Sequence, residues 1–127
     1  LEQRLARSRA AGSGTERLDA YIEFWGNYLP EIYAVARALL DAQANDEAAA
    51  AAWNERMQAM RDGCRAAIAA LESDGHLAKT WSTEEATDFL WMMLSVRNWE
   101  QLTQACGWST SQYIRRMQAV ARQTFKE

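Results

Sequence analysis

The chain has 127 residues, enough for one domain but too few for two of ordinary size. Alanine supplies 24 residues, whereas glycine supplies 6 and proline 1, and so few turn-forming residues exclude a β-sandwich or barrel. The formal net charge is −3, so the chain lacks the basic excess that is typical of a nucleic-acid binder. Six tryptophans are many for so alanine-rich a sequence, and the fold has to account for them.

The cellular compartment is indicated by what the sequence does not contain. Cys64 and Cys106 have neither the spacing of a metal site nor the number needed for a disulfide framework. No apolar run reaches the roughly 18 residues of a membrane span, and no signal peptide is apparent. We therefore expect a cytoplasmic protein with no cofactor, no bound metal and no membrane partner. The first residue, Leu1, is not Met, as in a fragment or processed product, although a choice of numbering has the same effect.

The first half of the chain predicts two or three helices after a short basic one at residues 1–11. Ser13, with Glu16 three residues later, forms a capping box for the next helix. Pro30 has no N–H to continue that helix, so it either kinks the helix or begins a new one at about residues 31–44. The apolar stripe before the proline consists of Leu18, Ile22, Trp25 and Leu29.

A long helix is predicted next, at residues 47–73, with Asp46 as its cap and Gly75 just beyond its end. Gly63 lies inside it and costs about 1 kcal/mol relative to Ala. We expect either a close neighbour or a bend at that glycine. The inner stripe of this helix consists of Trp53, Met57, Met60, Cys64, Ala67 and Leu71.

The second half of the chain predicts two more helices. Ser82 and Glu85 open a helix at about residues 83–105, and Ser109 opens the last one. On a helical wheel the first of these is apolar on two opposite sides, which indicates a helix between two layers, one of which can belong to another subunit. One side carries Ala86, Phe89, Leu90 and Met93, and the other carries Trp91, Ser95, Trp99, Leu102 and Cys106. The chain thus predicts a single all-α domain, a bundle of about six helices.

Catalytic chemistry has little support in the sequence. The single histidine, His76, follows a helix end, and Cys64 lies on an apolar stripe, where cysteine usually packs as a small hydrophobe. Nucleophile-elbow, phosphate-loop and dinucleotide-binding motifs are absent. Acidic residues gather at helix starts, where capping and the helix dipole explain them. We therefore predict no catalytic residues.

Aromatic and methionine residues are the stronger functional signal. Such stripes usually form an ordinary core, but this sequence is poor in Ile and Val, and buried Trp and Tyr need polar partners. Cavities of this composition also hold ligands in helical bundles. We therefore predict a pocket in which tyrosine hydroxyls and an indole N–H orient the ligand. Its predicted residues are Tyr21, Trp25, Tyr28, Met57, Met60, Cys64, Phe89 and Met93.

The stretch from Glu84 to Gln118 resembles the C-terminal part of TetR-type transcriptional regulators. The most specific elements are the helix opening Glu84-Glu85-Ala86 with Leu90 and Trp91, then Ser95, and finally Gly107-Trp108-Ser109 with Tyr113. The upstream order of a short basic helix, Gly-Ser-Gly, two shorter helices and a long helix is also similar. Where the family commonly has Pro and Glu after the position of Ser95, this chain has Val96 and Arg97, so we expect a weaker bend there.

This resemblance implies an effector-binding and dimerisation domain. It implies a homodimer in which the last two helices of each copy form a four-helix interface, and a pocket for a small hydrophobic or aromatic effector among the middle helices. Residues 1–11 would be the tail of a helix from a DNA-binding head that this chain lacks, so DNA would be a partner only through that head. The expected dimer face consists of Trp91, Ser95, Trp99, Leu102, Tyr113, Met117 and Val120.

Two other hypotheses remain open from the sequence. The domain can be a helical dimerisation module with a filled core and no ligand, in which case its tryptophans are structural. It can also be an enzyme, which would require a convergent acid–base pair in a cleft.

Overall fold

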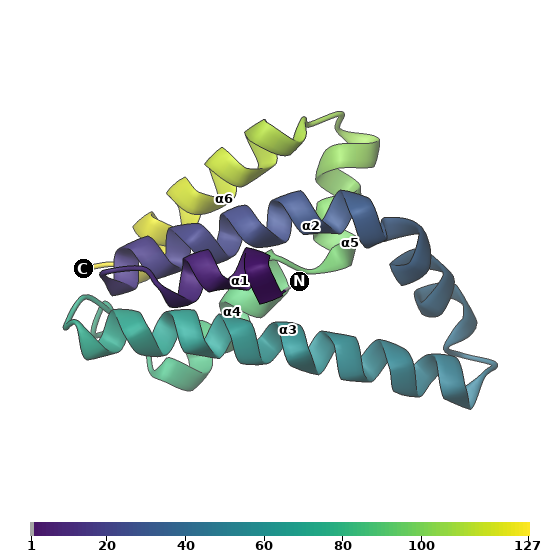
Figure 1. Ribbon diagram of the computed structural model, residues 1–127, viewed down its shortest axis with the longest axis horizontal. Coiled ribbons are helices and arrows are strands. Elements are labelled where there is room, and N and C mark those ends of the chain that lie inside the picture. Colours follow the sequence, from purple (N-terminus) through teal and green to yellow (C-terminus); the bar gives the residue numbers. More distant parts are fainter. Residues whose placement is uncertain (1) are drawn as a thin grey trace.

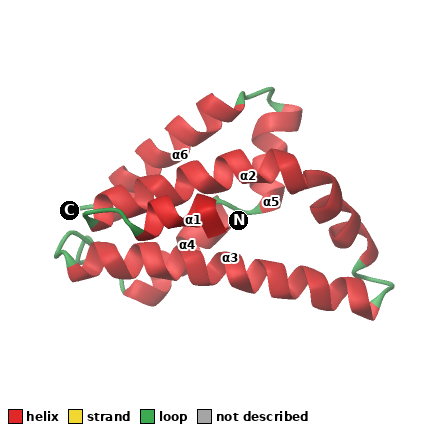
Figure 2. Ribbon diagram, viewed as in Figure 1, coloured by secondary structure: helices red, strands yellow, loops and turns green. Residues whose placement is uncertain are grey.

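The computed structural model describes the backbone of residues 2–127 and the side chains of residues 5–127. These residues form an all-helical bundle without a β-strand, which confirms the predicted all-α class (Figure 1, Figure 2). None of the described helices is long and apolar enough to cross a bilayer. The elements in chain order are α1 (Glu2–Arg9), α2 (Gly14–Ala42), α3 (Glu47–Ser73), α4 (Thr83–Met93), α5 (Val96–Glu100), the π-helical turn η1 (Gln101–Ala105) and α6 (Thr110–Phe125).

Helices α2 and α3 are the two long elements on which the others pack. Figure 1 shows α1 lying over the space between them, α6 along the side of α2 that faces away from α3, and α4 and α5 behind. Helix α3 ends in a Schellman motif, in which the N–H of His76 donates to the carbonyl of Leu71 and Gly75 has a positive φ of 77°. The segment after it then meets the C-terminus, because the N–H of Ala78 donates to the carbonyl of Phe125 at 2.7 Å.

The predicted capping residues begin their helices as expected. Each places a side-chain oxygen where it accepts a hydrogen bond from an otherwise unpaired backbone N–H in the first turn. The caps Ser13, Asp46, Ser82 and Ser109 accept from the N–H groups of Glu16, Ala48, Glu85 and Gln112, at 3.2, 2.9, 3.1 and 3.1 Å.

Of the two alternatives at Pro30, the structure shows the kink: helix α2 runs through the proline as one bent element (Figure 1). One predicted helix differs in the structure. The predicted helix at residues 83–105 is instead three pieces, because Ser95 caps a new helix by accepting from the N–H of Asn98 at 3.2 Å. The helix therefore breaks at Ser95, where the hydroxyl begins a new first turn without a proline.

Glycines allow close approaches between helices. A Cβ on Gly63 would lie 2.5 Å from the Tyr21 hydroxyl, so the expected close neighbour is confirmed and is an aromatic ring of α2. A Cβ on Gly14 would lie 2.5 Å from the carbonyl oxygen of Ala70 in α3. The N–H of Gly14 also donates to the carboxylate of Asp74, which fastens the start of α2 to the end of α3.

Candidate functional site

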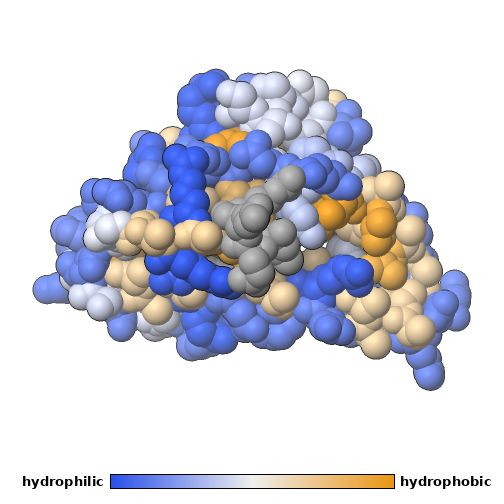
Figure 3. Space-filling view, viewed as in Figure 1, coloured by the Kyte–Doolittle hydropathy of each residue, from blue (hydrophilic) through white to orange (hydrophobic). Residues whose placement is uncertain are grey.

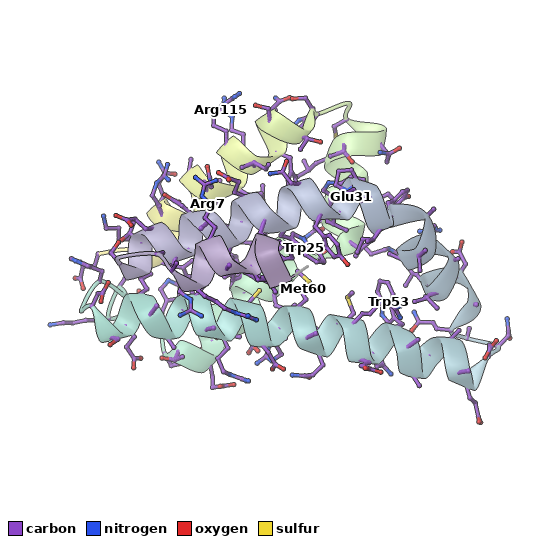
Figure 4. The ribbon with its side chains drawn as sticks, in the orientation of Figure 1. Arg7, Trp25, Glu31, Trp53, Met60 and Arg115 are labelled. Atoms are coloured by element: carbon purple, nitrogen blue, oxygen red, sulfur yellow. The ribbon has the colours of Figure 1, made fainter. Side chains whose placement is uncertain are left out.

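A cavity of about 570 Å³ lies between α1, α2 and α3, and Val96 at the start of α5 contributes to its wall. Pockets of about 300–1,000 Å³ accommodate small organic ligands. Figure 4 shows Trp25 of α2 and Met60 of α3 on opposite sides of this space. The apolar lining consists of Leu5, Tyr21, Phe24, Trp25, Tyr28, Ile32, Val35, Ala36, Met57, Ala59, Met60, Gly63, Ala66 and Val96, and the polar lining of Ser8, Arg9, Arg56 and Asp62.

A line of aromatic rings on α2 forms one wall of the cavity. The rings of Phe24 and Tyr28 stack with centroids 5.4 Å apart, and Tyr21 packs against Phe24 at 5.9 Å. These three residues are three and four positions apart, so a helix places them on one face. Beyond them α2 bends near Pro30, and Val35 is 55% exposed at the edge of the cavity. Hydrophobic surface is visible over the second half of α2 in Figure 3.

The polar tips of two lining aromatics are already used within the protein. The Tyr21 hydroxyl donates to the carbonyl of Met60 at 3.0 Å, and the Trp25 indole N–H donates to the carbonyl of Leu94 at 2.7 Å. Burial raises the pKa of Tyr21 well above its ordinary value of 10.0, so the hydroxyl keeps its proton. Both groups therefore use their O–H or N–H donor on a backbone carbonyl, which leaves neither donor for a ligand. They offer ring faces to the cavity instead.

Five of the eight predicted pocket residues line the cavity, namely Tyr21, Trp25, Tyr28, Met57 and Met60. Cys64 is fully buried outside the lining, and burial raises its pKa from 9.0 to about 12, the opposite of what a nucleophilic cysteine needs. Met93 is buried in the core away from the cavity. Phe89 is 39% exposed, and its ring packs against Trp81 and Phe125.

The error on α4 has a simple geometric cause. A helical wheel gives the angles between side chains on one helix but not the neighbour that each side faces. The side that carries Phe89 turns toward α6, whereas the cavity lies between α1, α2 and α3.

Several lining residues were not predicted. Phe24 had a usable signal, because it lies three residues after Tyr21 and four before Tyr28 on the same helix face. Ile32, Val35 and Ala36 lie beyond the proline, where the direction of the bend decides what they face. Val96 joins the cavity only through the break at Ser95, and Arg9 and Arg56 are exposed residues of α1 and α3 that only the tertiary structure brings to one cavity.

The residues of the predicted dimer face differ in exposure in the structure. Tyr113, Trp99 and Met117 are buried within the single chain, at 0%, 3% and 9% exposure, so their side chains are not an available surface. The Tyr113 hydroxyl and the Trp99 indole nitrogen have no hydrogen-bond partner among the described residues. Ser95 caps α5, Leu102 is half-buried and Val120 is 40% exposed.

Trp91 of the predicted dimer face lies toward α3 instead. The Arg61 guanidinium is 5.2 Å from the centroid of its ring, a cation–π contact, and pairs with Asp88 at 2.6 Å. Glu84 also lies 3.4 Å from Arg61, so this flank of α4 is held by charges on α3.

The opposite flank of α4 and the neighbouring part of α6 expose apolar side chains. Phe89 and Met92 are 39% and 47% exposed, and Val120 on α6 is 40% exposed. The Phe89 and Phe125 rings meet edge-on at 6.3 Å, which joins the two helices. We call Phe89, Met92 and Val120 the α4–α6 face.

The described residues contain no group of three or more His, Cys, Asp or Glu side chains that could hold a metal ion. In comparisons with known proteins, no family model, no curated protein and no solved structure matched the chain. Functional inference therefore rests on the cavity and on the exposed apolar surface.

Proposed function

We propose that the chain is the regulatory domain of a TetR-like transcriptional regulator, which binds a small hydrophobic or aromatic effector in the cavity between α1, α2 and α3. In this proposal DNA binding belongs to a head that precedes α1, and the domain pairs with a second copy of itself. The observation that carries the proposal is the cavity, with its volume of about 570 Å³ and its lining of aromatic rings and methionines. A filled core, the alternative hypothesis, is disfavoured by the same observation.

The lining supports an effector with an apolar body. Tyr21 and Trp25 have satisfied polar tips, so they contribute ring faces, and methionines adapt to irregular shapes. Burying apolar area stabilises such a complex by about 25 cal/mol per Å² before the costs of association.

Helix α1 provides a physical route for control. Leu5 and Ser8 of α1 lie on the cavity wall, while the neighbouring Arg7 pairs with Glu23 of α2. A ligand in the cavity therefore contacts the helix that would lead to the DNA-binding head. The ligand can shift an equilibrium between two positions of α1 only as far as its affinities for those two positions differ.

The binding proposal is tested with the neutral fluorophore N-phenyl-1-naphthylamine. We expect saturable enhancement of its fluorescence by the chain and an increase in Tm, because binding to the folded state alone stabilises it. Met57→Trp, which adds bulk to the cavity wall, should weaken binding, and Met92→Leu on the α4–α6 face should not. Absence of saturable binding together with an unchanged Tm would contradict effector binding.

The dimer proposal rests on the α4–α6 face and is tested by light scattering at micromolar concentration. We expect a dimer that Met92→Glu or Val120→Glu converts to a monomer, because each buries an unpaired charge in the interface. Val35→Glu is the matched control, since Val35 is an exposed apolar residue of α2 outside this face. Trp99 is unsuitable for this test because it is buried. A substitution there would change the stability of the single chain rather than the dimer contact alone. A dimer without any ligand binding would favour the module that only dimerises.

A further inference from the structure

The cavity lining includes three charged residues, and they differ in the partners that balance their charges. Arg9 of α1 and Arg56 of α3 are exposed guanidinium groups that contribute to the lining, and Asp62 is the single carboxylate there. Ser8 is buried, and its hydroxyl donates to the carbonyl of Arg17 at 3.3 Å. The charged residues are therefore at the solvent-facing rim of a cavity whose interior is apolar.

Asp62 is compensated by its own helix. One of its carboxylate oxygens accepts a hydrogen bond from the Gln58 amide at 3.0 Å and lies 3.7 Å from the Arg65 guanidinium. Its negative charge is thus balanced by partners within α3, and it forms no ion pair with Arg56.

Arg56 is not compensated in this way. It donates one hydrogen bond, at 3.5 Å, to the carbonyl of Ala52 in its own helix. None of the ion pairs formed between described residues includes Arg56. Guanidinium N–H groups at an apolar cavity are suited to carboxylates and other oxyanions, to which they donate two parallel hydrogen bonds.

We propose that the cavity takes an amphipathic anion, with an apolar or aromatic body against the Tyr21, Phe24 and Tyr28 rings and an oxyanion head at Arg56. This inference rests on the proposed function, because it specifies the effector class of the same cavity. The aromatic wall supplies most of the affinity, whereas Arg56 distinguishes an anion from a neutral molecule of the same shape.

The test compares two probes that share an aromatic skeleton. 1-Anilinonaphthalene-8-sulfonate carries a sulfonate oxyanion, and N-phenyl-1-naphthylamine is its neutral counterpart. In fluorescence titrations of the 127-residue chain, we expect Arg56→Gln to raise the Kd of the sulfonate about three- to tenfold, as expected for one solvent-exposed charge-assisted contact. The Kd of the neutral probe should change less than about twofold. Arg56 is exposed, so the substitution should leave the fold intact, which circular dichroism checks.

Matched variants separate a local contact from the general effect of charge. Arg115→Gln removes the same charge from the outer surface of α6 (Figure 4) and should leave both Kd values unchanged. Asp62→Asn should tighten sulfonate binding slightly or leave it unchanged. Added salt should weaken binding of the sulfonate to the wild-type chain and have less effect on the Arg56→Gln variant.

The outcomes distinguish this inference from the proposed function. If the neutral probe binds and Arg56→Gln affects the two probes equally, the anion inference is overturned and the effector cavity stands. If Asp62→Asn weakens binding more than Arg56→Gln does, the rim does not select anions. If neither probe binds saturably, or if Met57→Trp leaves both Kd values unchanged, the cavity is not the binding site and the proposed function fails with it.

Discussion

Helices α2 and α3 are in close contact at one end, the contact end, and are separated by the cavity at the other, the cavity end. At the contact end, Gly14 lies against the backbone of Ala70, and the fully buried Leu71 fills the adjoining core. At the cavity end, α2 bends near Pro30, and Ile32 and Met57 face a space of about 570 Å³ (Figure 1). Small residues bring the helices together at one end, and large rings line the space between them at the other.

The difference shows how one pair of helices combines stability with room for a ligand. Close packing at the contact end is sensitive to every added or removed methylene group. At the cavity end the lining lacks neighbours on one side, so side chains there contribute less to stability. We therefore expect substitutions at the two ends to separate stability from binding.

The largest expected difference comes from matched truncations. Leu71→Ala should lower the free energy of unfolding by about 3 kcal/mol, because it leaves a hole in a filled core. Met57→Ala, at the partly open cavity wall, should cost only about 1 kcal/mol. Urea unfolding followed by tryptophan fluorescence measures both. Equal losses would show that the cavity end is as tightly packed as the contact end.

The glycines give the next largest effect. Gly14→Ala should destabilise the chain by about 2 kcal/mol, because its Cβ would overlap a backbone carbonyl that cannot rotate away. Gly12→Ala is the control, since a Cβ there meets only a Glu16 carboxylate oxygen at 3.5 Å, and should change stability by less than about 0.5 kcal/mol. A Gly14→Ala variant as stable as Gly12→Ala would contradict the close helix contact.

Alkaline pH should lower the free energy of unfolding through Cys64, which is buried in the core. Burial raises the pKa of Cys64 from 9.0 to about 12, so the unfolded chain releases this proton before the folded chain does. The stability that this group contributes is complete below pH 9 and is lost as the pH rises toward 12, at about 1.4 kcal/mol per pH unit. Cys64→Ala should reduce that slope in urea unfolding, and Cys106→Ala, at an exposed cysteine, should not. Identical slopes in both variants would rule out the buried thiol as the cause.

Tyr21→Phe should have the smallest effect. Loss of the hydrogen bond to the Met60 carbonyl should cost about 1 kcal/mol of stability. Because that hydroxyl is used within the protein, binding of N-phenyl-1-naphthylamine should keep its wild-type Kd. A marked loss of affinity without a change in stability would indicate that the hydroxyl contacts the ligand.

The sequence anticipated elements whose signals are local. The caps at Ser13, Asp46, Ser82 and Ser109 act within one helical turn, and the bounds of α3 follow from its cap and its terminal glycine. Tyr21, Trp25 and Tyr28 were correctly predicted at the cavity, because all three belong to one continuous helix.

Errors arose where a neighbour decides the outcome. Nothing local chooses between a kink and a new helix at Pro30, or shows that the Trp25 indole reaches the Leu94 carbonyl 69 residues later. The two apolar sides of α4 were recognised, but Phe89 was assigned to the cavity although its ring packs against Phe125, and the contact of Trp91 with Arg61 was not predicted. Both contacts join helices that are distant in sequence.

The sequence by itself determined the helical class, the starts of α2, α3, α4 and α6, and the aromatic character of α2, because hydrogen bonds and side-chain periodicity within a few residues encode them. Only the tertiary structure decided that α2 continues past Pro30, that a cavity opens beside the bend, and that Arg56 and Arg9 lie on its rim. Those features depend on how rigid helices are oriented when they pack, and that orientation is fixed by long-range contacts such as Gly14 on Ala70 and Gly63 on Tyr21.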